Sequence, residues 1–149
     1  MAKRSNNIPV FGSLKYWSSV NLNRGWLMEP KDELINRKLE ELRSVPGVEG
    51  CALVTVGGLL ISSSLPGKVP EDEVAAICAA ALNVAKKINS GLYRGDFEME
   101  IVKGSRGYAI LMNVDTETLL VTLTDKDALL GQVFIEARRI ARELAEALA

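Results

Sequence analysis

Residues that could do chemistry are few and widely separated in this sequence. It has no histidine, which excludes Ser-His and Cys-His nucleophiles and histidine metal sites. Cys51 and Cys78 both lie in apolar runs, where a free cysteine behaves as a small buried hydrophobe. They predict neither a metal site nor a disulfide framework, and such cysteines are typical of a reducing cytoplasm.

Three polar features suggest chemistry but have plainer interpretations. Residues 103–107 include glycine, serine and basic residues, as phosphate loops do, but lack their full spacing and precede a strand, which favours a hairpin turn. Asp125 and Asp127 precede a helix, where aspartates are ordinary caps. Arg94 and Arg106 lie in predicted loops, so each is either a candidate arginine finger or a solvated side chain. We expect no enzyme, no cofactor and no metal, and keep Arg94 and Arg106 as candidate partner-binding residues.

The rest of the chain is organised around residues 70–90, PEDEVAAICAAALNVAKKINS, which predict a helix without a polar side. Pro70 and the acidic residues after it are typical of a helix start. At the helical period, a core-facing stripe comprises Val74, Ile77, Cys78, Ala81, Ala85 and Ile88. The opposite side carries Ala76, Ala79, Ala80 and Asn83 where charged residues are expected. This second side indicates a partner, most simply a second copy of the chain; the alternative is an exposed alanine-rich face, since alanine is the best helix former.

Composition predicts a single soluble domain. The chain has 149 residues, of which 48% are hydrophobic and 25% charged, enough to bury about two-thirds of the unfolded surface. Its net charge of −1 gives no electrostatic footprint for nucleic acid. No apolar run is long enough to span a bilayer or to act as a secretory signal, so we expect a cytoplasmic protein.

Residues 1–30 differ from the remainder because they are basic, rich in Ser and Asn, and contain both tryptophans, Trp17 and Trp26. One interpretation is a flexible extension. A second is a segment that binds a partner or a membrane surface, with Trp17 and Trp26 as contacts, because apolar residues recur there at rough helical spacing. A third is an upstream artefact, with Met28 as the natural start.

Periodicity and turn residues give the order of elements in residues 31–149. Helices are predicted at residues 31–44, 70–90 and 129–148, and strands at 48–56, 59–63, 96–102, 108–114 and 119–124. Gly57 and Gly58 supply two positions of positive φ for a tight hairpin. In the third strand, Phe97, Met99 and Ile101 alternate with Glu98 and Glu100, which predicts one buried and one wet face.

These elements predict an α+β domain with a five-stranded antiparallel sheet, in the order α-β-β-α-β-β-β-α. The first and last helices each have one apolar stripe, so they are expected to share one face of the sheet. The middle helix is then expected to cover the other face.

This order and several segments together resemble the roadblock/dynein light chain family, whose members include proteins similar to mutual gliding protein B. The resemblance covers residues 33–148 and rests on LEELRSVPGVEG (39–50), the hairpin with SSSLP (62–66), the alanine-rich helix, Gly107-Tyr108, and TDKDALLG (124–131). It implies the roadblock (profilin-like) architecture for residues 31–149.

The resemblance also implies a dimer, of this chain with itself or with a paralogue, in which middle helices pack antiparallel and third strands pair. The implied interface comprises Ala76, Ala79, Ala80, Asn83, Lys87, Phe97, Met99 and Ile101. It further implies a non-enzymatic scaffold and regulator of a small Ras-like GTPase, including a role as a GTPase-activating co-regulator.

Two other functions remain open from the sequence. One is a structural adaptor of a motor, secretion or membrane complex, anchored by residues 1–30. The other is a small-ligand sensor, which ranks lower because no cluster of convergent polar residues is evident.

Overall fold

The computed structural model describes residues 4–5, 7–8 and 30–149. The chain divides into two units, Met1–Leu34 and Ile35–Ala149. In the first, the two-residue strands β1 (Arg4–Ser5) and β2 (Asn7–Ile8) pair in parallel, which the sequence pattern does not predict. The predictions for Trp17, Trp26 and Met28 lie outside the described residues.

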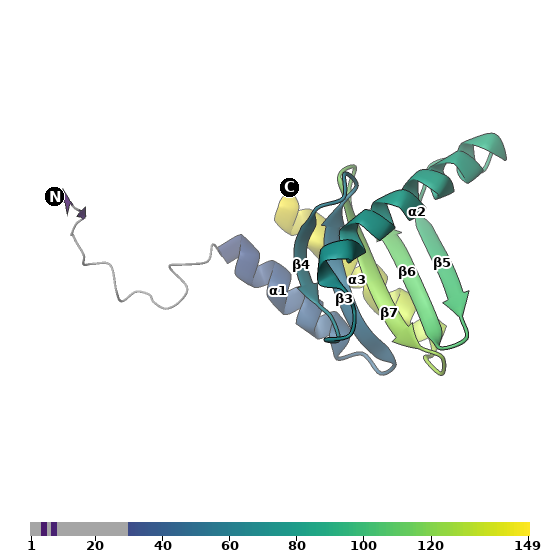
Figure 1. Cartoon of the computed structure of the whole chain (residues 1–149), viewed down its shortest axis with the longest axis horizontal. Helices are drawn as coiled ribbons and strands as arrows, with labels where there is room; N and C mark the ends of the chain where they lie inside the picture. The colour runs from purple at the N-terminus through teal and green to yellow at the C-terminus, as the bar shows by residue number, and fades with distance from the viewer. Residues whose placement is uncertain (1–3, 6, 9–29) are drawn as a thin grey trace. The chain divides into compact units, whose positions relative to one another are not determined.

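The second unit contains most of α1 (Pro30–Arg43) and all later elements. These are β3 (Val48–Thr55), β4 (Leu60–Ser64), α2 (Glu71–Gly91), β5 (Met99–Gly104), β6 (Gly107–Asn113), β7 (Thr118–Asp125) and α3 (Leu130–Leu148). The five strands form one antiparallel sheet in the order β4-β3-β7-β6-β5 (Figure 1). The predicted α-β-β-α-β-β-β-α order is confirmed.

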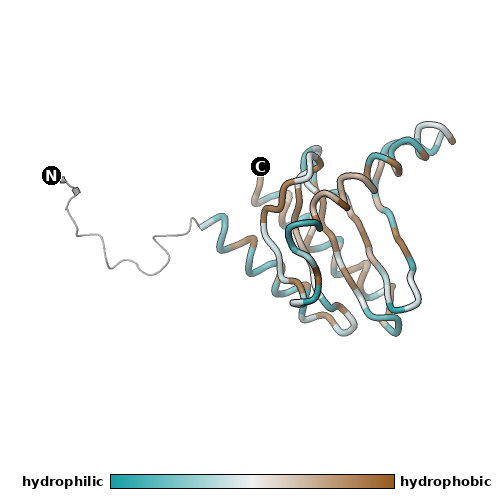
Figure 2. The backbone as a smooth tube through the Cα atoms, in the orientation of Figure 1, coloured by the Kyte–Doolittle hydropathy of each residue, from teal (hydrophilic) through white to brown (hydrophobic). Residues whose placement is uncertain are grey.

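Helices cover both faces of this sheet. On one face, Leu39 of α1 and Ile140 and Leu144 of α3 are fully buried against residues such as Leu53 and Leu120. On the other, α2 buries Val74, Ala75, Cys78, Leu82 and Ala85. The central strands β3 and β7 are therefore buried nearly throughout, and each contains a run of apolar residues (Figure 2). The prediction that the first and last helices share one face, and the middle helix takes the other, is confirmed.

The stripe of α2 that faces the core differs from the predicted one. Ile77 and Ile88 were predicted to be buried, but their side chains are 58% and 49% exposed. Ala75 and Leu82 are buried in their place. Because the helix is apolar on two sides, periodicity alone left its orientation undetermined, and packing on the strands below fixed it.

The first hairpin turn also differs. Only Gly58 has positive φ, 98°, whereas positive φ was predicted for Gly57 as well. Thr55 N–H donates to the Leu59 carbonyl (2.8 Å) and Gly58 N–H to the Thr55 carbonyl (3.0 Å), which encloses three loop residues. A three-residue hairpin loop needs one left-handed residue at its end, and Gly58 supplies it.

The third strand starts later than predicted, and its alternation is not the expected one. Phe97 precedes β5 and packs under α2, whereas Met99 packs on the α1 and α3 side. Glu100, predicted to be wet, has an Oε1 atom that is buried without a hydrogen-bond partner. Phe97 lies in irregular backbone before β5, so the two-residue alternation of a strand does not extend to it. Asp125, expected to cap α3, instead accepts from Asp127 N–H, and α3 has no side-chain cap.

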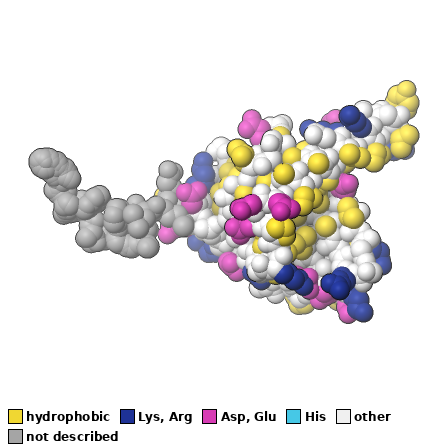
Figure 3. Space-filling model, in the orientation of Figure 1, with side chains coloured by type: hydrophobic (Ala, Val, Ile, Leu, Met, Phe, Trp, Pro, Cys, Tyr) yellow, Lys and Arg dark blue, Asp and Glu magenta, His cyan; other side chains and the backbone are white. Residues whose placement is uncertain are grey.

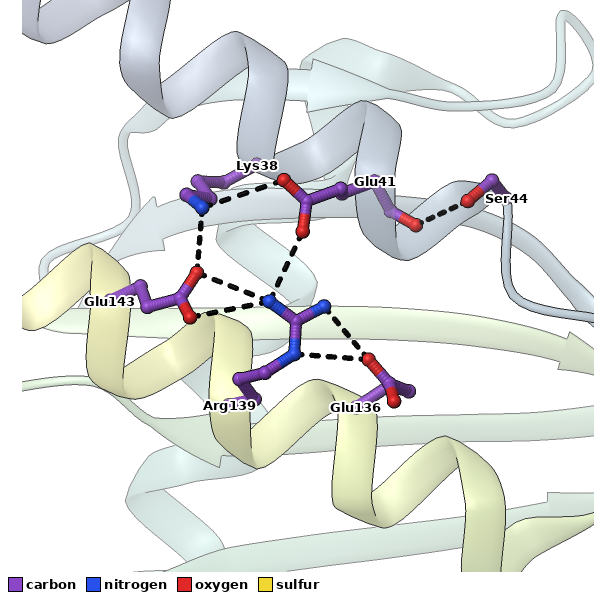
Figure 4. Close-up of polar contacts among 6 residues, drawn as sticks. All are labelled: Lys38, Glu41, Ser44, Glu136, Arg139 and Glu143. Atoms are coloured by element: carbon purple, nitrogen blue, oxygen red, sulfur yellow. Dashed lines mark hydrogen bonds and ion pairs between the residues drawn. The ribbon is translucent and has the colours of Figure 1, made fainter.

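A network of charged side chains joins α1 to α3 (Figure 4). The Lys38 ammonium lies 2.7 Å from Glu143, and the Arg139 guanidinium lies 3.1 Å from Glu41, 2.8 Å from Glu136 and 3.2 Å from Glu143. The hydrogen bond from Lys38, followed by that from Arg139, holds the pKa of the Glu143 carboxyl below its ordinary value of 4.5. The hydrogen bond to Glu143 raises the pKa of Lys38, and the hydrogen bonds to Glu136 and then to Glu41 raise the pKa of Arg139.

We expect Glu143→Gln to lower the melting temperature slightly at neutral pH. A depressed carboxyl pKa contributes stability above the unfolded pKa, and that contribution is lost as pH falls through the folded value. The deficit of the variant should therefore shrink on titration from neutral pH to about pH 3, as followed by circular dichroism melts. Glu146→Gln is the matched control, since Glu146 is exposed and in no ion pair within the described residues. An equal deficit at both pH values would contradict the ionic explanation.

Candidate protein interface

The outward side of α2 carries a stripe of exposed apolar side chains. Ile77, Val84 and Ile88 are 58%, 57% and 49% exposed, and Ala80 lies among them. Their spacing of seven and four residues places them on one line along the helix. Figure 3 shows hydrophobic side chains gathered over α2 and the sheet beside it. Exposed apolar residues in one continuous line indicate a surface that another protein covers.

An apolar groove of about 290 Å³ runs beside this stripe, between α2 and the sheet. Ile77, Cys78 and Ala81 form its wall on α2, and Val102, Ala109 and Leu123 lie on the strands below. All the residues that line it are apolar. The stripe and the groove form one continuous apolar surface, because Ile77 belongs to both.

The sheet has a free edge next to this surface. β5 pairs with β6 on one side, and its other side has no strand beside it in the described chain. Val102 and Ile101 on β5 are 51% and 44% exposed. An unpaired edge strand offers backbone N–H and C=O groups to a second chain. In Figure 1, the C-terminal end of α2 extends past this edge.

The structure brings together most of the predicted interface residues of α2. Four of them are exposed, namely Ala76, Ala80, Asn83 and Lys87. Ala79 is half-buried, because it faces the turn of the first hairpin: a Cβ on Gly58 would lie 3.8 Å from Ala79 Cβ. Ala79 is therefore partly covered within the chain.

The predicted residues around β5 do not form one surface. Ile101 is exposed at the edge, but Phe97 is only 9% exposed and belongs to the core under α2. Met99 is half-buried against α3 on the opposite face.

Arg94 and Arg106 are exposed but far apart. Arg94 follows α2 and donates through Nε to the Leu92 carbonyl at 2.9 Å. Arg106 lies in the turn between β5 and β6. The six residues of β5 separate them, which corresponds to about 20 Å. They therefore cannot act on one phosphate group together.

Neither cysteine is placed for reactivity. Burial raises the pKa of Cys51 to about 12 and that of Cys78 to about 11, with Glu100 adding to the second shift. Cys51 Sγ donates to the Leu39 carbonyl at 3.1 Å on one face of the sheet, and Cys78 lies on the other face. Within residues 30–149, no cluster of three metal-binding side chains is present, and no helix there is long and apolar enough to cross a membrane.

Comparison with known proteins identifies the family. The family model of the Roadblock/LC7 domain matches residues 34–124. The chain belongs to the Roadblock/LC7 family. An uncharacterised protein of Methanocaldococcus jannaschii, MJ1340, is 32% identical over 111 residues, which cover 74% of this chain and 96% of that protein.

Solved structures of Roadblock/LC7-like proteins have the same fold. The gliding protein MglB of Thermus thermophilus superposes with a TM-score of 0.75 at 23% identity, over 80% of this chain and 91% of that one. MglB of Myxococcus xanthus gives a TM-score of 0.75 at 20% identity, with the same coverage of both chains. These superpositions show a shared fold.

Sequence reasoning missed the part of this Roadblock/LC7 surface that is most apolar. Ile77 and Ile88 were assigned to the core, and Val84 was assigned to neither side. A signal was present, since Val84 is seven residues from Ile77 and four from Ile88 and so falls on the same line of the helix. A β-branched residue there is unfavourable for an exposed helix position, and therefore pointed to a covered face.

Proposed function

We propose that this chain is a dimeric, non-enzymatic scaffold, formed with itself or with a paralogue through α2 and β5. The observation that carries the proposal is the continuous apolar surface made by Ile77, Val84 and Ile88 with the adjoining groove. The free edge of β5 supports it further, since a two-fold axis beside that strand would continue the sheet into a second copy.

The most direct geometry is antiparallel packing of the two α2 helices. A helix of 21 residues is about 31 Å long, and its C-terminal end extends past β5 (Figure 1). Two-fold symmetry at β5 would lay that end over the partner's sheet, where the apolar groove lies open. Small residues such as Ala80 allow two helices to approach closely.

We propose that the dimer binds and regulates a small Ras-like GTPase in the cytoplasm. Support comes from membership of the Roadblock/LC7 family and from the fold shared with the gliding proteins MglB. Because Arg94 and Arg106 lie at opposite ends of β5, the regulator is expected to act by positioning the GTPase's own switch residues rather than by supplying a joint arginine site.

The test is a pull-down against the host's Ras-like proteins, loaded separately with GTP and GDP. We expect nucleotide-dependent recovery of one GTPase, and at least tenfold lower recovery with Ala80→Glu/Val84→Glu, since tenfold corresponds to about 1.4 kcal/mol. Leu129→Glu/Gln132→Glu adds the same charge on α3, across the sheet, and should leave recovery unchanged. Failure to recover any Ras-like protein in either state would contradict the GTPase assignment.

A further inference from the structure

Neighbouring arginines of α3 have different surroundings. Arg139 points toward α1, and its guanidinium pairs with Glu41 of α1 and with Glu136 and Glu143 of α3 (Figure 4). Arg138 and Arg142 are exposed and point to the other side of α3, toward the start of β5. Within residues 30–149, neither Arg138 nor Arg142 takes part in an ion pair or a side-chain hydrogen bond.

These two arginines flank a hollow of about 260 Å³ on the α1 and α3 face of the sheet. Apolar parts of it come from Met99, Met112, Val114 and Ala141. Methionine is flexible and polarisable, so a methionine-lined hollow adapts to different apolar side chains. Glu98 is the one acidic residue in its lining, and it lies more than hydrogen-bonding distance from either guanidinium, so positive charge predominates.

The spacing of Arg138 and Arg142 is electrostatically unfavourable within the chain. Like charges four residues apart on a helix repel each other by a few tenths of a kcal/mol. Elsewhere on α3 the arrangement is the reverse, since Arg139 and Glu143 attract each other at that same spacing. A pair of carboxylates from outside the chain would remove the repulsion and form two charge-assisted contacts.

The apolar surface continues past the hollow. Ile135 is 67% exposed one helical turn before Arg138, and Ile101 on β5 is 44% exposed. Ile101 lies on the same side of its strand as Met99, since strand residues two apart share a side. Exposed apolar side chains thus lie near the hollow on both α3 and β5.

We propose that this hollow binds an acidic amphipathic helix of a partner protein. One apolar side chain of that helix enters between Met99 and Met112, and two carboxylates one turn apart pair with Arg138 and Arg142. A helix matches because its residues four apart have the same spacing as the two arginines. The site lies on the opposite face of the sheet from α2, and β5 is the one element that it shares with the proposed dimer surface.

The test uses the full chain and a synthetic probe. The probe is a fluorescein-labelled helical peptide of about 16 residues, long enough to be partly helical, with leucines on one face flanked by glutamates four apart. Fluorescence anisotropy should report saturable binding at about 0.15 M salt, where exposed charges are already screened. Arg138→Ala/Arg142→Ala should weaken it at least tenfold.

Two controls separate specific pairing from general attraction. Lys68→Ala/Lys126→Ala removes two exposed cations that lie outside the hollow, and it should leave the affinity unchanged. The charge swap Arg138→Glu/Arg142→Glu should reject the glutamate probe and bind a matched lysine probe. Because all these side chains are exposed, the variants are expected to fold, which circular dichroism checks.

Several results would overturn the proposal. One is that the unaltered chain does not bind the glutamate probe at physiological salt. Another is that the lysine variant loses as much affinity as Arg138→Ala/Arg142→Ala. A third is that Arg138→Glu/Arg142→Glu does not bind the lysine probe. Arginine-dependent binding to vesicles of phosphatidylcholine and phosphatidylserine, without binding to the peptide, would also overturn it and would assign the arginines to a membrane surface instead.

Discussion

The double variant Ala80→Glu/Val84→Glu is expected to be a monomer of 16.2 kDa, whereas the proposed dimer of the unaltered chain has twice that mass. Both positions lie on the exposed stripe of α2. In a two-fold dimer, four new carboxylates would enter one apolar seam without partners. Like charges in such a seam cost several kcal/mol, which corresponds to roughly a thousandfold weaker association.

Light scattering over a dilution series measures this prediction, and circular dichroism checks that the monomer still folds. Leu129→Glu/Gln132→Glu is the matched control, because it also adds two charges and replaces one exposed apolar residue, Leu129, which is 69% exposed. These positions lie at the start of α3, where negative charge is tolerated. A dimer that persists unchanged in the Ala80→Glu/Val84→Glu variant would show that α2 is not the interface.

The layers of the fold were predictable from the sequence because most elements bury one side only. In α3, Val133, Ala137, Ile140 and Leu144 recur at the helical period, and all four are buried. β3 contains the apolar run CALV and β7 contains the run LLV, and such continuous runs are typical of strands covered on both faces. Such patterns leave a single way to bury the apolar side chains.

The predictions that were wrong concern segments whose sequence is compatible with two orientations of the side chains. Helix α2 is apolar on two sides, so either could face the sheet, and packing turned Ile77 outward. The alternation around β5 suggested a strand with Phe97 and Met99 on the same side. Phe97 instead stands before the start of β5, where the alternation of a strand does not apply.

The candidate interface was predictable only in outline. Alanines at positions 76 and 80 indicated a covered face because they replace expected charges. The groove next to Ile77 could not be predicted, since it is formed by Val102, Ala109 and Leu123 from strands that are distant in sequence. The hollow beside Arg138 was missed for the same reason, because Met99 and Met112 come from two different strands.

Gly107→Ala is expected to destabilise the domain more than alanine at any other glycine of residues 30–149. Gly107 opens β6, beside the end of β7, and a Cβ at this position would lie 1.9 Å from the Thr124 carbonyl oxygen. The atom that it meets belongs to the backbone of a paired strand, so no side-chain rotation relieves the overlap. The two strands must separate locally, which breaks pairing in the register of Gly107 with Asp125 and of Tyr108 with Thr124.

Overpacking against a fixed backbone belongs to the severe class of substitutions, costing on the order of 3 kcal/mol or more. For a domain of this size, that lowers the melting temperature by roughly 10 °C, as calorimetry can measure. Gly67→Ala is the matched control, because no atom lies within 4 Å of a Cβ there, and it should melt within about 1 °C of the unaltered chain. If Gly107→Ala were equally neutral, β6 and β7 would have to be further apart at Gly107 than the structure places them. Since the β5–β6 hairpin starts its return at this residue, loosening it should also weaken the β5 edge, and the proposed dimer should dissociate before the rest of the domain unfolds.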